Sequence, residues 1–270
     1  MRARYITAGE GGVDPTDRGL AYGDGLFETM SLRAGRVERL SLHLDRLREG
    51  CARLELPMPA ETELERRIGE AAAAIERGTL KLILTRGAGP RGYAPPAAPV
   101  PTVILLPEAR FPAPVSGITV TVLSTRLGEN EKLAGIKHLN RLEQVLGRLE
   151  LVRVGADEGL MLSTSGAVIG GTSRNLFAVY GDRVRTPAVD RAGIAGVMRR
   201  AVLEQCAALG IDAAAAKLVP ADLERADALF MTNALVGIQP VTRLDRKTFA
   251  SPAMAQRLSA ALGIGEQGGA

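Results

Sequence analysis

The residue with the clearest chemical potential is Lys137, which stands in the segment 134–146 with the sequence AGIKHLNRLEQVL. Apolar residues recur here at helical spacing and predict an amphipathic helix: Leu139, Leu142, Val145, Leu146 and Leu149. Lys137 therefore lies just before that helix, where its amine can face a cavity. A desolvated lysine amine loses its charge easily and attacks carbonyl groups, which is the chemistry of a Schiff base. A solvated surface charge is the ordinary alternative for a single lysine.

Four further blocks concentrate glycine, arginine, asparagine and threonine. They are 17–29 (DRGLAYGDGLFET), 85–93 (TRGAGPRGY), 175–177 with 193–199 (NLF and GIAGVMR), and 230–234 (FMTNA). Together with 135–146, and in this order, they resemble the motifs of the aminodeoxychorismate lyases. That group belongs to the class IV, or fold type IV, family of pyridoxal-phosphate enzymes, alongside branched-chain and D-amino-acid aminotransferases. Five blocks in order across nearly the whole chain are far more specific than any one of them.

The resemblance implies pyridoxal 5'-phosphate as the cofactor, with Lys137 as the residue that binds it covalently and then acts as the catalytic base. Phosphate dianions are bound in proteins by guanidinium groups, backbone amides and helix N-termini. The resemblance assigns the phosphate contacts to four residues: Arg46, Val197, Met198 and Asn233. Val197 and Met198 would contribute backbone amides, because they follow a glycine that opens a predicted helix.

The resemblance also assigns residues to the substrate. Arg91 and Tyr93 match the place where related transaminases trap a substrate carboxylate, and a planar guanidinium suits that group. In the family this loop comes from the neighbouring subunit, which implies a homodimer. Phe27, Glu28 and Thr29 would line the pocket from the other side, with Thr29 relaying a proton to the leaving group.

One position departs from the family pattern. Family members carry a glutamate four to six residues before the Asn-Leu-Phe motif, where it pairs with the pyridine nitrogen. Here that place is Gly170, and no carboxylate lies between Ala167 and Asn175. A less protonated ring is a poorer electron sink. Either the reaction tolerates the loss, because forming an aromatic ring supplies driving force, or the site is weakened or repurposed; the intact remaining blocks favour tolerance.

The reaction implied by the resemblance converts 4-amino-4-deoxychorismate to 4-aminobenzoate and pyruvate, a lyase step of folate synthesis. Two alternatives stay open: a D-amino-acid or branched-chain aminotransferase of the same fold, and a non-catalytic relative. The run 137–144 (KHLNRLEQ) argues against the first, because the transaminases diverge from it. Lys137 and Arg46 argue against the second, because a pure binding protein needs neither.

Bulk composition agrees with a small-molecule enzyme. The chain has 270 residues, 46% of them hydrophobic, and a net charge of +4 with its arginines spread out, so we expect no nucleic-acid partner. Two histidines cannot build a histidine-rich metal site, and Cys51 and Cys206 fall on apolar helical patterns typical of core residues. No apolar run approaches the ~18 residues of a membrane span, and no apolar segment follows the N-terminal MRARY. We therefore expect a cytoplasmic protein without a signal peptide.

The expected elements alternate between helix and strand. Ser41 reads as the N-cap of a helix through Leu54, and a second helix is expected from about 60 to 77, ended by Gly78. A third helix is expected over 194–209. Strands are expected at 79–85, 102–106, 118–123, 159–163, 167–169, 175–180 and 228–231.

These elements predict a mixed α/β chain in two domains. The expected boundaries are 1–112 for an N-terminal α/β domain, 113–117 for a linker rich in proline and glycine, and 118–270 for a C-terminal cofactor-binding domain that carries Lys137. The resemblance, and not the periodicity, implies the fold type IV arrangement of the D-amino-acid aminotransferases, with the active site between the domains.

Overall fold

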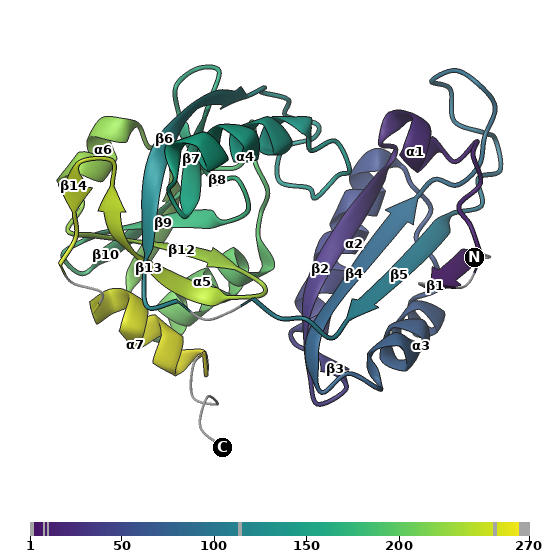
Figure 1. Cartoon of the computed structure of the whole chain (residues 1–270), viewed down its shortest axis with the longest axis horizontal. Coiled ribbons are helices and arrows are strands. Elements are labelled where there is room, and N and C mark those ends of the chain that lie inside the picture. Colours follow the sequence, from purple (N-terminus) through teal and green to yellow (C-terminus); the bar gives the residue numbers. More distant parts are fainter. Residues whose placement is uncertain (1–2, 8, 10, 113–114, 251–252, 265–270) are drawn as a thin grey trace. The chain divides into compact units, whose positions relative to one another are not determined.

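The computed structural model describes residues 3–7, 9, 11–112, 115–250 and 253–264. The chain forms two compact units: unit 1 is Met1–Pro112 with Ile136–Asn140, and unit 2 is Ala113–Gly135 with Arg141–Ala270 (Figure 1). The segment Ile136–Asn140, which includes Lys137, thus clusters with unit 1, whereas we expected Lys137 in the C-terminal domain. The predicted linker falls partly on residues 113–114, which lie outside the described part of the chain.

Unit 1 is a twisted sheet with helices. Its strands, in the spatial order β1-β5-β4-β2-β3, are β1 (Arg4–Thr7), β5 (Thr102–Glu108), β4 (Arg77–Thr85), β2 (Gly25–Arg33) and β3 (Arg36–Val37). Its helices are α1 (Arg18–Tyr22), α2 (Leu40–Leu54) and α3 (Glu61–Ala72). β1 runs parallel to β5 and the other neighbours are antiparallel.

The alternation of β2 separates the two faces of this sheet. Leu26 and Met30 are buried, while Phe27 and Thr29 between them are half-buried. Helix α2 packs on the Leu26 face so closely that a Cβ at Gly50 would lie 2.8 Å from a Leu26 methyl carbon. Phe27 and Thr29 therefore point to the opposite face, away from the α2 core.

Unit 2 contains, among its described residues, a larger sheet with the spatial order β11-β10-β9-β12-β13-β6-β7-β8, and β14 pairs with β13. The strands are β6 (Ile118–Leu127), β7 (Glu158–Ser163), β8 (Val168–Gly171), β9 (Asn175–Tyr180), β10 (Arg183–Pro187), β11 (Asp212–Ala216), β12 (Ala228–Asn233), β13 (Gly237–Leu244) and β14 (Lys247–Thr248). The helices are α4 (Leu142–Val154), α5 (Val197–Ala208), α6 (Pro220–Arg225) and α7 (Ala253–Ala261).

Successive residues of β9 and β12 belong to two separate hydrophobic clusters of unit 2, because alternate side chains of a strand point to opposite faces of the sheet. Phe177 and Phe230 stack with ring centroids 4.8 Å apart in the cluster that also holds buried residues of α5 and α7. Leu176 and Met231 belong to the second cluster, which includes a buried leucine of α6. The sheet is therefore buried on both sides, which fixes its register.

The predicted strands are confirmed, and β9 has the expected bounds. Cys51 and Cys206 are buried in α2 and α5, as predicted. The second helix was predicted too long: α3 ends at Ala72, and Gly78 lies inside β4, where its ideal Cβ would be 2.2 Å from the Glu108 carbonyl oxygen. Gly78 is thus needed for close strand pairing and does not end a helix.

Two helix starts also differ from the prediction. Helix α2 begins at Leu40 after Arg39, and no side chain caps it, so Ser41 is not the N-cap. Helix α5 begins at Val197, three residues later than expected, because residues 193–196 form an extended approach to the helix that contacts the strands below it.

The apolar face of helix α4 points outward and does not pack into the core. The buried residues of this helix are Gly147 and Leu151. The apolar residues that recur at helical spacing are at least half exposed: Leu142, Val145, Leu146 and Leu149. The pattern predicted the helix correctly, but its apolar face points outward.

Candidate active site

Lys137 is held beside the start of β2 by main-chain hydrogen bonds. The Phe27 N–H donates to the Lys137 carbonyl oxygen at 3.0 Å, and the Leu139 N–H donates to the Gly25 carbonyl oxygen at 3.0 Å. A bridge between Leu26 and His138 completes this short antiparallel pairing. These bonds explain why Ile136–Asn140 clusters with unit 1, and they fix the backbone from which the Lys137 side chain projects.

The Lys137 amine lies over the Phe27 ring. Its Nζ is 4.2 Å from the ring centroid, within the range of a cation–π contact. Thr29 points to the same face of β2 and stands opposite Lys81 of β4, whose Nζ is 5.5 Å from the same ring. The structure therefore brings together Lys137, Phe27 and Thr29, three of the residues that the sequence assigned to the site.

Arg46 lies on the other face of β2, in a buried cluster with Glu28 and His43. The Arg46 Nε donates to Glu28 Oε1 at 2.8 Å, Arg46 Nη2 pairs with Glu28 Oε2, and His43 Nδ1 is 2.6 Å from Glu28 Oε2. Burial by itself would raise the pKa of Glu28, but Arg46 and His43 lower it to about 2. The buried carboxylate is ionised and orients the Arg46 guanidinium.

Glu28 does not share the face of β2 on which Phe27 and Thr29 lie, although we expected these three residues to line the pocket together. Adjacent strand residues point to opposite faces, so Glu28 is directed at α2, where it is 2% exposed. Sequence reasoning also missed His43. A usable signal was present, because His43 and Arg46 are three residues apart and so share one helix face opposite a strand glutamate.

The start of α5 has main-chain amides that no side chain caps. The N-cap of this helix is Gly196, and the first amides of a helix have no acceptor within it. Val197 and Met198 stand at this start, as predicted from the glycine pair. A Cβ at Gly196 would lie 2.0 Å from Asn175 Oδ1, so a larger residue here would require the Asn175 side chain to move.

The first turn of α5 carries a partly buried arginine, Arg199. Arg199, in the first turn of α5, donates to the Pro187 carbonyl oxygen at 3.1 Å and to Thr186 Oγ1 at 3.3 Å, and burial lowers its pKa. Within the described residues Arg199 forms no ion pair. A cation in the first turn also opposes the helix dipole, so this end of the helix favours an anion.

Thr232 lies on the side of the sheet against which α5 packs, and its hydroxyl has no hydrogen-bond partner among the described residues. Its side chain is fully buried. Thr232 pairs with Asn175 of β9 and shares a face of β12 with Phe230, which belongs to the cluster packed against α5. A buried hydroxyl without a partner is costly, so this hydroxyl fits a polar ligand such as a phosphate. Sequence reasoning had passed it over for Asn233.

Asn233 ends β12 next to Thr232. Its Oδ1 accepts hydrogen bonds from the Leu235 and Val236 amides at 3.0 and 2.9 Å, and so shapes the turn that follows. The donor end of the same amide is the part that suits an anion. Unit 2 thus contains donors of the types that bind phosphate in proteins: the amides at the start of α5, the Thr232 hydroxyl and the Asn233 side-chain amide.

Gly170 lies in β8 opposite Met161. A Cβ there would lie 2.9 Å from the Arg174 carbonyl oxygen, so a larger residue would require the backbone to shift. The nearby acid Glu158 is fully buried, and its oxygens accept hydrogen bonds from Thr172, Ser173 and Arg174. Burial would raise the pKa of Glu158, but Thr172 and Arg174 lower it. This carboxylate anchors the 171–174 turn.

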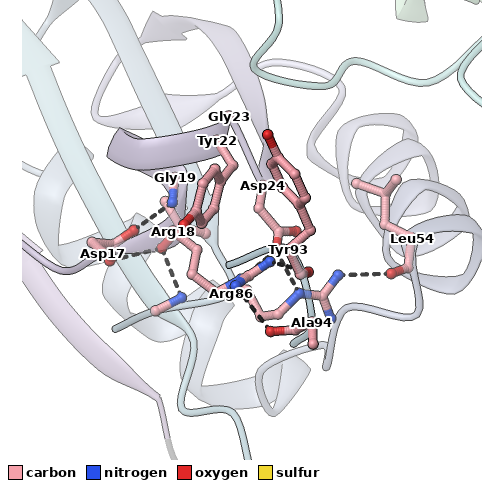
Figure 2. A network of polar contacts seen from close by, with 12 residues as sticks. Asp17, Arg18, Gly19, Tyr22, Gly23, Asp24, Leu54, Arg86, Tyr93 and Ala94 are labelled. Carbon is pink, nitrogen blue, oxygen red and sulfur yellow. Dashed lines mark hydrogen bonds and ion pairs between the residues drawn. The ribbon is translucent and has the colours of Figure 1, made fainter. Parts of the chain in front are cut away.

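Arg91 and Tyr93 lie in the connection between β4 and β5, at residues that contain no helix or strand. Tyr93 is 86% exposed, and Arg91 is exposed as well. The base of this connection is tied down by a polar network around Arg18, shown in Figure 2. The structure thus keeps both predicted substrate-binding side chains at the surface of unit 1.

The described residues contain no cluster of three or more His, Cys, Asp or Glu side chains suited to a metal ion. Among the helices that the structure describes, none combines the length and apolarity that a transmembrane helix requires.

Comparisons with known proteins show the family of the chain. A model of the family described as amino-transferase class IV matches residues 25–244. An aminodeoxychorismate lyase of Vibrio harveyi is 35% identical over 231 residues, 84% of this chain and 85% of that protein. A putative branched-chain-amino-acid aminotransferase of Methanocaldococcus jannaschii is 30% identical over 252 residues, 91% of this chain and 87% of that protein.

Among solved structures, the 4-amino-4-deoxychorismate lyase from Pseudomonas aeruginosa superposes with a TM-score of 0.89. It is 42% identical, and the alignment covers 93% of this chain and 94% of that chain. The predicted α/β fold of type IV is confirmed by this likeness. The chain belongs to the class IV aminotransferase family, whose members use pyridoxal 5'-phosphate.

Proposed function

We propose that this protein is a pyridoxal-phosphate-dependent lyase that converts 4-amino-4-deoxychorismate to 4-aminobenzoate and pyruvate, as a cytoplasmic step of folate synthesis. The observation that carries the proposal is the position of the Lys137 amine, 4.2 Å from the Phe27 ring and on the face of β2 that Thr29 shares. The 42% identity to the Pseudomonas aeruginosa lyase supports this reaction over the other reactions of the family.

The residues that the sequence resemblance assigned to the phosphate remain our proposal for cofactor binding. Arg46, aligned by Glu28, would pair with the phosphate, and the Val197 and Met198 amides with Asn233 would complete its contacts. Thr232 joins this set because its buried hydroxyl has no partner among the described residues. When bound, the cofactor supplies an electron-withdrawing system conjugated to the amine of the substrate.

The residues of this chain would then move two protons. The Lys137 amine removes the proton from the carbon that bears the substrate amine. The electron pair of that bond forms the new ring double bond, and the bond from the adjacent carbon to the enolpyruvyl oxygen breaks. Thr29 would deliver a proton to the departing enolpyruvate, which becomes pyruvate. The ring is left aromatic, which supplies driving force in a site without a carboxylate at Gly170.

The substrate carries two carboxylates. Arg91 would pair with one of them in a bidentate contact, with Tyr93 beside it and Phe27 against the substrate ring. In our proposal Arg91 and Tyr93 reach the site of a second copy of the chain.

The outer face of α4 supports a homodimer. This face consists of Leu142, Val145, Leu146, Leu149 and Val152, each at least half exposed. The acids of the helix turn inward instead: Glu143 accepts the Gly128 amide, and Glu150 accepts the Ser124 amide. A contiguous apolar helix face on a surface marks an interaction site.

A two-fold axis places the same surface of two copies against each other, so one apolar helix face is enough to form such an interface. We therefore propose a second copy of this chain as the partner of the outer face of α4.

The reaction is tested with the purified protein, pyridoxal phosphate and 4-amino-4-deoxychorismate. We expect 4-aminobenzoate and pyruvate in equal amounts without any added keto acid, and neither product from Lys137→Ala. Turnover of D-alanine or of a branched-chain amino acid, dependent on an added keto acid and without 4-aminobenzoate from the chorismate amine, would establish an aminotransferase instead. Absence of a borohydride-reducible cofactor band would support the non-catalytic alternative.

A further inference from the structure

Arg18 is a buried arginine that holds three consecutive carbonyl groups of a distant loop. Its Nη2 donates to the Tyr93 carbonyl oxygen at 2.8 Å, and its Nη1 donates to those of Gly92 and Ala94 at 3.0 and 3.2 Å. Its Nε donates to Asp24 Oδ2 at 2.8 Å (Figure 2). The Arg18 side chain is only 4% exposed, so these bonds are shielded from water.

Neighbouring residues hold Arg18 in turn. Asp24 Oδ2 also accepts the Arg86 Nε at 2.8 Å, and Arg86 donates to the carbonyl oxygens of Leu54 and Glu55 at the end of α2. Burial would raise the pKa of Asp24, but the hydrogen bonds from Arg86 and Arg18 lower it, which keeps its charge. The network thus connects the loop to α2 and β4 through one carboxylate.

Tyr22 adds a second attachment to the same turn. Its hydroxyl accepts the Gly92 amide at 3.0 Å, and its ring lies 4.9 Å from the Arg18 guanidinium. The ring of Tyr93 meets the Tyr22 ring edge-on, with centroids 5.4 Å apart. Although Tyr93 is 86% exposed, its ring therefore has a defined orientation.

These contacts matter because residues 90–101 have no regular structure of their own. An exposed segment without backbone pairing samples many conformations, and fixing it by tertiary contacts removes that freedom in advance of binding. The fork of guanidinium donors can engage three successive carbonyls and a carboxylate at once, which a lysine ammonium on a flexible stem cannot do.

We infer that Arg18 is a positioning residue for the substrate: with Asp24 and Tyr22 it fixes the 92–94 turn and so presents Arg91 and Tyr93 for recognition of a substrate carboxylate. This inference rests on the proposed function, in which Arg91 and Tyr93 contact the substrate. Arg18 itself touches the loop and not the reacting atoms, so its loss weakens substrate capture and leaves the chemical step intact.

Two measurements on the holoenzyme test the inference separately. Trypsin cleavage after Arg91, followed by mass spectrometry of the fragments 1–91 and 92–270, reports the order of the turn without any substrate. Steady-state kinetics with 4-amino-4-deoxychorismate report capture and chemistry as KM and kcat. Arg48→Gln is the matched control, because Arg48 is a half-exposed arginine of unit 1 that pairs with Asp45 and Glu61 on the surface.

For Arg18→Gln we expect cleavage after Arg91 to accelerate about tenfold and KM to rise about tenfold. A tenfold change is the size expected when one charge-assisted contact is lost. We expect kcat to change less than about threefold. Arg48→Gln should match the wild type in both. Unchanged cleavage, or a fall in kcat at constant KM, would overturn the inference. If Arg18→Gln does not fold, Tyr22→Phe takes its place, and unchanged cleavage and KM there overturn it equally. A wild-type protein that makes no 4-aminobenzoate refutes the proposed function, while the cleavage data still decide whether Arg18 orders the turn.

Discussion

At the scale of single residues, the candidate site depends on charges that are buried and partnered. Glu28 is the strongest case, since its ionised carboxylate aligns Arg46 and contacts His43 inside unit 1. A buried carboxylate is retained only when its partners offset the cost of its desolvation. The geometry of Arg46 therefore depends on a residue whose own side chain faces away from Phe27 and Thr29.

We predict that Glu28→Gln weakens the binding of pyridoxal phosphate. The substitution removes the Glu28 charge that orients the Arg46 guanidinium, so we expect cofactor affinity to fall about tenfold and the free energy of unfolding to fall by about 3 kcal/mol. Titration of the apoprotein with the cofactor, followed by absorbance, measures the first, and urea unfolding measures the second. Unaltered affinity would show that Glu28 does not position Arg46 for the phosphate.

Thr232 allows a cleaner test, because its hydroxyl has no partner among the described residues. Thr232→Val removes that hydroxyl with little change of shape. We predict that the apoprotein becomes no less stable, since an unpaired buried polar atom is lost, while cofactor affinity falls about five- to tenfold. A variant that loses stability in the apo form and binds the cofactor normally would assign the hydroxyl a purely structural role.

At the scale of elements, the start of α5 is built by glycines that side chains would block. The ideal Cβ of Gly196 meets Asn175, and that of Gly193 meets Ile169 at 2.5 Å. The Asn175 side chain also donates to the Ile194 carbonyl oxygen at 2.9 Å, which ties the approach of the helix to β9. These contacts set the direction of the amides at Val197 and Met198.

Gly196→Ala should therefore destabilise the protein and displace the first turn of α5. We expect the free energy of unfolding to fall by about 1–3 kcal/mol, as for other overpacked sites, together with weaker cofactor binding. Gly69→Ala is the matched control: Gly69 lies within α3 with open space around its ideal Cβ, so this change should stabilise the protein by about 0.5–1 kcal/mol. Urea unfolding of both variants makes the comparison, and equal effects would contradict the packing argument.

At the scale of the whole molecule, stability should depend on pH through buried carboxylates in both units. The folded-state pKa of Glu28 is about 2, and those of Asp24 and Glu158 are also lowered. A carboxylate with a lowered folded pKa adds stability above its unfolded pKa and loses that stability as the pH falls through the folded value. Acid should therefore weaken the fold by protonating these carboxylates, while their arginine partners keep their charge.

We predict that the urea midpoint is constant near neutral pH and falls steadily from about pH 4.5 toward pH 2, the interval between the unfolded and folded pKa of Glu28. In Glu28→Gln, which cannot titrate at this position, the decline over the same interval should be smaller. Identical pH profiles for the two proteins would mean that Glu28 has the same pKa in the folded and unfolded states.

Assembly is the second property of the whole molecule. We predict that the wild type is a dimer by light scattering and that Leu146→Glu combined with Leu149→Glu produces a monomer, because charges on the outer face of α4 would be buried without partners. Val219→Glu places the same charge at another exposed apolar residue and should leave the mass unchanged. A wild-type monomer, or a double variant that remains a dimer, would show that the outer face of α4 does not form a dimer interface.

The sequence by itself determined the features that depend on near neighbours. The alternation at 79–85, the strand at 175–180 and the spacing of Leu44, Leu47 and Cys51 are local patterns, and the structure has the corresponding strands and helix. The ordered motifs were enough for the family, but the helix after Lys137 begins only at Leu142. Boundaries that rested on one residue were less secure: Gly78 proved to be a site of strand pairing, and Ser41 does not cap α2.

Only the tertiary structure decided which face each side chain takes and what it meets there. Glu28 turns to α2 because its strand alternates against a helix that the sequence could not position. The apolar stripe of α4 points outward because Gly147 and Leu151 are the residues that pack inward. Arg18 meets residues 92–94 across more than seventy positions of the chain. Such contacts arise from the packing of distant segments, and no periodicity within a short window encodes them.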